Sequence, residues 1–259
     1  MSCAAALVAL NLLLFHRKLL VAFQETRAPA GSTTTTRTNL AGLTGADSKE
    51  NPPSAPVRVI TDTDRDKALE LFTRGTELLE QKRFAEALEA FEASLGLDPE
   101  SEDTQYNLGF TLSKLGRAEE AIGAYKEALR ILPDYAEAHN NLGNLLKTQG
   151  MLEEAIGHFN AALKIMPDHS SAHNNLGVAL AQQGKIHEAT LHFAKALQLQ
   201  PDYADAHYNL GSAYASVGRL DEAIVEFTKA LQLKPDFQPA VQALVKAQQT
   251  RAMQQSVQK

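Results

Sequence analysis

The sequence predicts an all-α protein, an extended solenoid of five tandem helix–turn–helix units followed by a capping helix. Two columns of residues predict this fold class, because each recurs every 34 residues along the chain. One column is glycine and the other is proline. The proline column contains half of the ten prolines in the chain of 259 residues. The glycine column is Gly75, Gly109, Gly143, Gly177 and Gly211, and the proline column is Pro99, Pro133, Pro167, Pro201 and Pro235.

The period divides the chain into complete units. Two further columns keep the same step: Ala87, Ala121, Ala155, Ala189 and Ala223, and Phe91, Tyr125, Phe159, Phe193 and Phe227. One helical hairpin cannot bury such positions alone, whereas stacked neighbours bury them in a continuous core. We therefore predict repeats over residues 61–237, with units at 68–101, 102–135, 136–169, 170–203 and 204–237.

Unit 136–169 illustrates why each unit is predicted to contain two helices. Its apolar residues recur at spacings of three and four, which is typical of one buried helix face. Gly150 suits the turn between the helices, and Pro167 ends the second helix because proline cannot continue one. Asp168 follows that proline and is predicted to cap the next helix. The apolar positions are Ala138, Leu142, Leu145 and Leu146, then Ala155, Ile156, Phe159, Ala162 and Leu163.

The small residues of this unit have a predicted packing role. Gly143 lets the second helix approach the first closely, and Ala155 is the matching small residue on the other helix. The Phe159 ring is then expected to fill the remaining volume.

The pattern resembles the tetratricopeptide repeat, through Leu142, Gly143, Leu146, Ala155, Phe159, Ala162 and Pro167. The resemblance covers all five units and implies a right-handed α-solenoid whose first helices line a concave groove. The first unit departs from the pattern with Arg74 in place of leucine and Lys82 in place of the turn glycine. Terminal repeats are expected to be atypical, since one of their sides meets solvent.

Both ends of the chain differ from the repeats. Residues 238–259 predict a capping helix that begins near Pro239, with a glutamine-rich tail beyond about Thr250. Residues 25–60 predict a disordered linker, because proline, glycine, serine and threonine make up more than half of 28–56. Residues 1–24 predict a hydrophobic targeting or anchor segment, and together these stretches form a flexible N-terminal extension.

Three interpretations of residues 1–23 stay open. The first is a membrane anchor, in which the basic triplet 16–18 that interrupts the apolar run lies at the lipid headgroups. The second is a cleaved targeting peptide, favoured by several basic residues, few acidic ones and many hydroxyls. The third is an inert tail. The first two predict that the repeats occupy a soluble compartment, with the protein membrane-anchored or organelle-targeted through its N-terminus.

Composition excludes several classes of function. The net charge of −6 argues against a nucleic-acid partner, and the single cysteine excludes a disulfide framework. No catalytic motif is present, so we predict no catalytic residue, no metal site and no cofactor. His139, His173 and His207 recur at the fourth position of successive first helices. Neighbouring helices are too far apart for these to share one ion, so we interpret them as packing residues at the seam between repeats.

The candidate site is the row of first-helix residues that the family places in its groove. At the sixth position of units two to five the residue is always asparagine, whose amide offers both donors and an acceptor. This ladder is similar to the asparagine ladder of O-GlcNAc transferase-type arrays, where it holds the main chain of an extended substrate. The alternative is that the amides bond neighbouring helices. The candidate peptide-binding residues are Asn107, Asn141, Asn175, Asn209, Tyr106, Asn140, Asn174, Tyr208, Phe110 and Lys147.

These observations favour a non-catalytic interaction scaffold that binds an extended peptide or a partner helix in the groove. Two alternatives remain at this stage. One is an accessory subunit or fragment of an O-GlcNAc-type glycosyl transferase. The other is a structural protein that self-assembles into a homo-oligomer.

Overall fold

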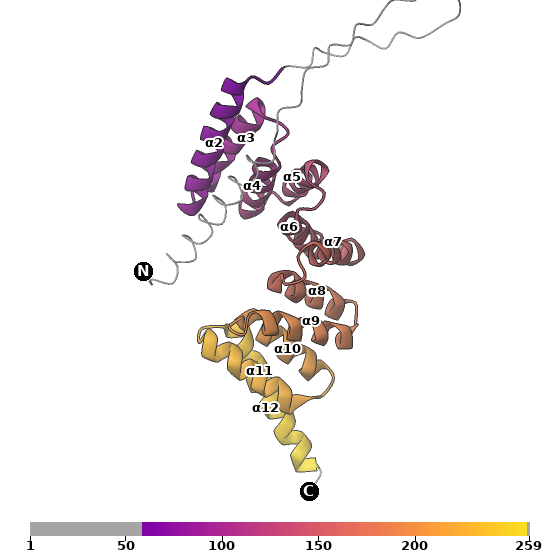
Figure 1. Cartoon of the computed structure of the whole chain (residues 1–259). Coiled ribbons are helices and arrows are strands. Elements are labelled where there is room, and N and C mark those ends of the chain that lie inside the picture. Colours follow the sequence, from indigo (N-terminus) through magenta and orange to yellow (C-terminus); the bar gives the residue numbers. More distant parts are fainter. Residues whose placement is uncertain (1–58, 258–259) are drawn as a thin grey trace, which may run out of the picture. The chain divides into compact units, whose positions relative to one another are not determined.

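The computed structural model describes residues 59–257, in which all regular elements are helices and no strand occurs. They follow one another in tandem (Figure 1). The helices are α2 (Asp62–Glu80), α3 (Phe84–Leu97), α4 (Glu102–Lys114), α5 (Ala118–Ile131), α6 (Ala136–Thr148), α7 (Leu152–Ile165), α8 (Ser170–Gln182), α9 (Ile186–Leu199), α10 (Ala204–Ser216), α11 (Leu220–Leu233) and α12 (Gln238–Val257).

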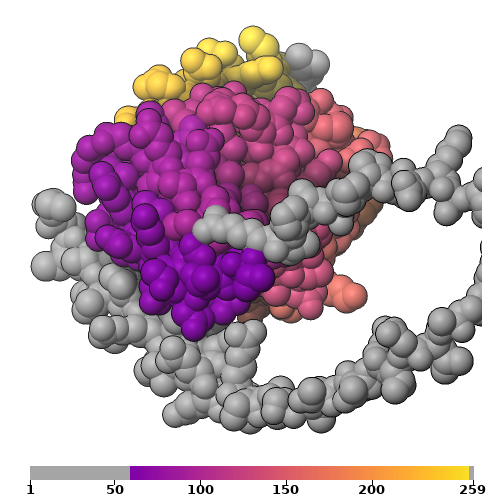
Figure 2. Space-filling view, turned by 90° about the horizontal axis from the view of Figure 1, so that it is seen from above, coloured from indigo at the N-terminus to yellow at the C-terminus, as the bar shows by residue number. Residues whose placement is uncertain are grey.

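The first ten helices form five hairpins that stack on one another. Within each hairpin two consecutive helices pack together, from α2 with α3 to α10 with α11. The second helix of each hairpin also contacts the first helix of the next. Seen from above, the indigo and magenta residues of the first hairpins lie in front of the later ones (Figure 2). The structure therefore confirms the predicted α-solenoid.

The close helix approach predicted from the glycine column is present in every hairpin. A Cβ atom built on Gly143 would lie 2.8 Å from Cε1 of Phe159 and 3.1 Å from the carbonyl oxygen of Ala155. The other four column glycines face the aromatic ring of their own unit in the same way. All five rings of the aromatic column are fully buried, so they have no room to move aside.

The predicted turn glycines adopt a backbone conformation that other residues avoid. Gly116, Gly150, Gly184 and Gly218 have φ between 77° and 80°, in the left-handed region between the two helices of a hairpin. In the first unit Lys82 occupies this position with φ 59°, the one non-glycine residue with positive φ in the described chain. The first hairpin thus carries a steric cost that the others avoid.

Two expectations about helix ends are corrected. Asp168 does not cap α8; the N-cap is His169, whose side chain accepts a hydrogen bond from the Ala172 backbone N–H at 3.4 Å. The tail predicted beyond Thr250 is helical as far as Val257. An ion pair of 2.9 Å between Arg251 and Asp221 joins this part of α12 to α11.

The predictions for residues 1–24, and for all but the end of the linker 25–60, lie outside the described residues. Within residues 59–257, no helix is both long enough and apolar enough to span a membrane.

Candidate functional site

The asparagine ladder forms hydrogen bonds between successive first helices. The Nδ2 atom of Asn175 on α8 donates to Oδ1 of Asn140 on α6 at 3.0 Å. One unit further on, Asn209 donates in the same way to Asn174 at 2.9 Å. In each case the sixth residue of one unit bonds the fifth residue of the preceding unit. The ladder therefore couples repeats 3, 4 and 5 directly.

The first two members of the ladder differ because their neighbours differ. Asn141 donates to the phenolic oxygen of Tyr106 at 3.1 Å, since the fifth residue of the second unit is tyrosine. Asn107 donates to the backbone carbonyl oxygen of Asp103 within its own helix, at 2.9 Å. Asn107 thus makes a bond within α4 instead of one between repeats.

Two predicted groove residues lie in the interior instead. Asn140 and Asn174 are only 7 % and 5 % exposed, so they do not lie on the open face where the sequence analysis placed them. Their side-chain oxygens accept hydrogen bonds from the next repeat, which satisfies the buried amides. Asn141, Asn175 and Asn209 keep partly exposed side chains.

The two predicted tyrosines pack through their rings. The ring of Tyr106 stacks on that of Tyr135, with 4.9 Å between the centroids. The ring of Tyr208 lies 5.1 Å from that of Phe237, at the start of the capping helix. Burial raises the pKa of Tyr106, and the nearby Glu137 carboxylate adds to this. Each ring leaves only part of its surface to a ligand.

The remaining predicted residues, Phe110 and Lys147, are partly exposed. The Lys114 ammonium lies 4.9 Å from the centroid of the Phe110 ring, close enough for a cation–π contact. Burial lowers the pKa of Lys147, whose stem lies along the core with its ammonium 6.0 Å from the centroid of Phe159. The partly exposed candidate residues of the first helices thus include apolar, amide and cationic groups.

The recurring histidines bond both within their own unit and to the preceding one. Nδ1 of His139 lies 2.9 Å from Nδ1 of His158 on α7, the second helix of the same unit. His173 and His192 repeat this pair at 3.0 Å one unit later. Each also bonds the preceding unit: Nε2 of His139 lies 3.0 Å from the carbonyl oxygen of Pro133, and His173 repeats this with Pro167. The predicted position at the seam is confirmed by these contacts, and each histidine in addition joins the two helices of its own hairpin.

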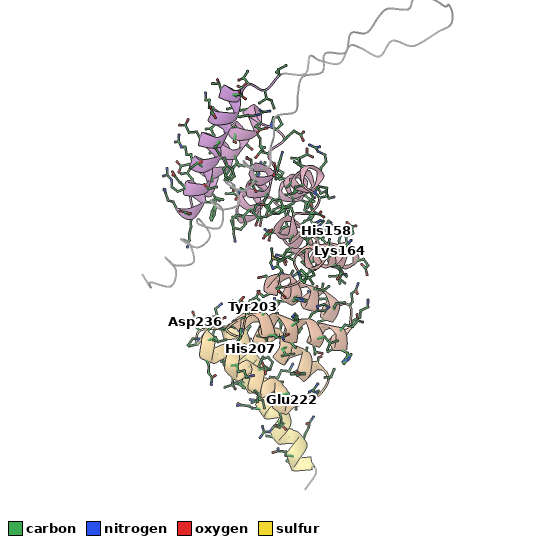
Figure 3. All side chains as sticks on the ribbon, viewed as in Figure 1. His158, Lys164, Tyr203, His207, Glu222 and Asp236 are labelled. Atoms are coloured by element: carbon green, nitrogen blue, oxygen red, sulfur yellow. The ribbon has the colours of Figure 1, made fainter. Side chains whose placement is uncertain are left out.

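The fifth unit replaces the second histidine of this pair by a carboxylate. Nδ1 of His207 lies 2.6 Å from Oε2 of Glu226, and the Lys229 ammonium lies 2.8 Å from the other oxygen of the same carboxylate. Figure 3 labels His207 on α10. Glu226 thus bonds both other groups, and all three line an open pocket of about 610 Å³.

Sequence reasoning missed these partners, although a signal was present. His158, His192 and Glu226 each follow the recurring histidine of their own unit by 19 residues. That constant separation marks two columns facing each other across the hairpin. In residues 59–257 no three histidine, cysteine, aspartate or glutamate side chains gather as a metal cluster.

Stacked helical hairpins with a repeated buried ring and glycine define a repeat protein of the α-solenoid class. Three family models, each described as tetratricopeptide repeat, match the chain over residues 68–101, over 100–168 and 134–202, and over 180–248. The chain belongs to the tetratricopeptide repeat family. None of the curated proteins compared with it matches.

Several solved structures share the fold. MamA is 26 % identical and covers 62 % of this chain and 94 % of its own, with a TM-score of 0.56. A thermophilic TPR protein of Thermus thermophilus, TTC0263, is 26 % identical over 70 % of this chain and 98 % of its own, also at 0.56. YrrB, described as a TPR protein with an unusual peptide-binding site, is 24 % identical over 70 % and 93 %, at 0.57.

Proposed function

We propose that this protein is a non-catalytic scaffold that binds an extended peptide along the row of its first helices. The proposal rests on the amide groups of the ladder that are not used in bonds between repeats. Asn175 and Asn209 each use one N–H to bond the preceding repeat, and a primary amide has a second N–H and a carbonyl oxygen. These groups match the donors and acceptors of a peptide main chain.

The ladder also holds its amides in place for such binding. A side chain already bonded to a neighbour loses less rotamer freedom when a ligand arrives, so less of the interaction energy is lost in ordering it. The bond that joins two repeats therefore serves binding as well as stability. The two interpretations left open by the sequence are thus compatible.

Specificity is expected to come from the side chains beside the ladder. Phe110 and Tyr208 present partly exposed rings, and Val178 adds a partly exposed aliphatic group between them in the chain. Amides that read the main chain discriminate little among sequences, whereas such apolar groups select side chains. We expect a peptide with apolar residues spaced along an extended chain.

The experiment starts from an array of unstructured peptides probed with the full chain, and the dissociation constant of the best peptide is then measured. Asn144→Arg places a long charged side chain on the first helix of the third unit. Blocking a central residue of an interface is expected to cost more than about 1 kcal/mol, so affinity should fall at least about fivefold.

The matched control is Asn160→Arg, the same substitution on an exposed residue of the second helix of that unit. It is expected to bind the peptide as the unsubstituted chain does. The proposal is overturned if Asn160→Arg loses affinity while Asn144→Arg keeps it, because the peptide then occupies the second helices. A second copy of the chain as the captured partner would instead favour self-assembly, which light scattering across concentrations detects.

A further inference from the structure

Two histidine pairs recur at the same place in the third and fourth repeats. His139 and His158 bring their Nδ1 atoms to 2.9 Å, and His173 and His192 bring theirs to 3.0 Å. The ring centroids are 5.2 Å and 5.3 Å apart, so the two pairs have nearly the same geometry. All four rings are partly exposed, and Figure 3 labels His158 on α7.

The hydrogen bonds of the first-helix histidine fix its tautomer. Nε2 of His139 lies 3.0 Å from the carbonyl oxygen of Pro133, and His173 repeats this contact with Pro167. A carbonyl oxygen only accepts, so Nε2 carries the hydrogen and Nδ1 of the neutral ring presents a lone pair to its partner. Metal-binding histidines are oriented in the same way, with the second ring nitrogen donating to a backbone carbonyl or a carboxylate.

We propose that each histidine pair is a binding site for a borderline divalent transition-metal ion such as Zn²⁺ or Ni²⁺. Imidazole nitrogen is a preferred ligand of these ions. With metal–nitrogen bonds of about 2.0–2.1 Å, two nitrogens on one tetrahedral ion lie roughly 3.3 Å apart. The Nδ1 atoms therefore need to separate by only a few tenths of an ångström, with a tilt of the two rings.

Metal binding needs one proton movement, which leaves the net charge of the pair unchanged. In the metal-free pair the second histidine donates its Nδ1 hydrogen to the lone pair of the first. When the ion binds, the second ring transfers this hydrogen to its own Nε2 through water, and both Nδ1 lone pairs face the ion. No proton has to be released from a neutral pair.

A carboxylate stands one helical turn before the second histidine of each pair. Glu154 precedes His158 by four residues and Glu188 precedes His192 by four, so each carboxylate shares a helix face with its histidine. Burial lowers the pKa of His158, and the Glu154 carboxylate opposes this. Because the described residues hold no preformed cluster of three ligands, this carboxylate or water completes the coordination.

The other repeats lack such a site. In the first two units the equivalent pairs are Leu71 with Ala90 and Gln105 with Ala124. In the fifth unit the carboxylate of Glu226 already bonds both His207 and the Lys229 ammonium. Both oxygens of this carboxylate are therefore occupied, and only one imidazole is present there to bind an ion. The structure thus assigns two ions per chain.

The test is calorimetric titration of the full chain with Zn²⁺ at pH 7.5, repeated with Ni²⁺. Two ions per chain are expected. His158→Gln and His192→Gln each reduce this to one, and the double variant binds at neither site; the glutamine amide still donates to the first histidine, which protects the fold. His187→Gln, an exposed histidine of α9, is the matched control and keeps two ions.

A melting experiment supplies a second readout. A ligand that binds only the folded state raises the melting temperature, so Zn²⁺ should stabilise the unsubstituted chain and the control but not the double variant. Glu226→His should reproduce the arrangement of the fourth unit, which also carries a lysine at the equivalent position, and raise the count to three. Fewer than one ion per chain, or a count unchanged in the double variant, overturns the proposal.

Discussion

The side-chain amide of Asn209 donates a hydrogen bond to Oδ1 of Asn174, one repeat earlier in the chain, at 2.9 Å. Asn174 is only 5 % exposed, so water cannot readily replace the lost donor if Asn209 is truncated. Leaving a buried acceptor unsatisfied costs about 1–3 kcal/mol. We therefore expect Asn209→Ala to lower the free energy of unfolding by that amount, measured by urea denaturation.

Asn144→Ala is the control for this prediction. Asn144 also lies on a first helix with a partly exposed side chain, but outside the column that bonds the preceding repeat. Its truncation is expected to change stability by less than about 0.5 kcal/mol, as is typical of surface sites. Equal effects of the two variants would show that the bond between repeats contributes nothing to stability.

Glycine-to-alanine substitutions in the third repeat are expected to have opposite signs at two positions. At Gly143 the new methyl group would meet the buried Phe159 ring at 2.8 Å, and overpacking of this kind typically costs about 1–3 kcal/mol. At Gly157 a Cβ atom meets nothing within 4 Å, in the middle of α7. There alanine should stabilise by up to about 1 kcal/mol, since it has the higher helix propensity.

Thermal unfolding of the two variants decides the matter. Gly143→Ala should melt below the unsubstituted chain and Gly157→Ala above it. If both variants melt above the unsubstituted chain, the glycine column does not mark a close helix contact, and helix propensity alone explains the effect.

The contacts within one hairpin were largely predictable from the sequence. Gly143 and Phe159 lie 16 residues apart and repeat together in every unit, so their columns indicated which residues pack. The turn glycines were equally predictable, because a left-handed backbone conformation favours glycine. Periodicity in the chain carries this information directly.

The contacts that define the candidate site were harder to predict. Asn140 and Asn175 are adjacent in space only because neighbouring repeats stack with a particular offset between their first helices. The sequence of a single repeat does not predict that offset. The neighbours Asn140 and Asn141 also read alike in sequence, although one is buried and the other partly exposed. The cap of α8 was missed by a single residue, from Asp168 to His169, which is the usual precision of a helix boundary.

Lys82→Gly is expected to stabilise the first repeat. Lys82 has φ 59°, a left-handed conformation that costs a residue with a Cβ atom about 1–2 kcal/mol. Glycine removes this strain but adds about 0.4–1 kcal/mol of unfolded-state entropy. The net gain should be roughly 0.5–1 kcal/mol, measured by thermal or urea unfolding.

Gly184→Ala, at the equivalent turn of the fourth repeat with φ 80°, supplies the reciprocal test. It introduces the strain that Lys82→Gly removes and should destabilise by a similar amount. Stabilisation by Gly184→Ala would mean that the left-handed turn is not retained when the residue changes.

The chain is expected to lose stability in alkali through its buried tyrosines. Burial raises the pKa of Tyr135 well above its usual range, and the nearby Asp103 carboxylate, which accepts the Tyr135 hydroxyl hydrogen at 2.9 Å, adds to this. Burial and the charge of Glu137 raise the pKa of Tyr106 as well. Ionisation is therefore favoured in the unfolded chain, where tyrosine titrates near about pH 10.

The direction of this pH dependence follows from the proton count. Below about pH 10 both states keep the phenolic proton, so the contribution to stability is fully present. As the pH rises further, the unfolded chain releases protons that the folded chain retains, and stability falls. Melting temperatures at pH 8 and pH 10.5 should show the loss, and Tyr135→Phe should show a smaller one, because its ring cannot ionise. Absorbance at 295 nm gives the independent check: if all tyrosines of the folded protein titrate together near pH 10, the phenols are not held in their neutral form.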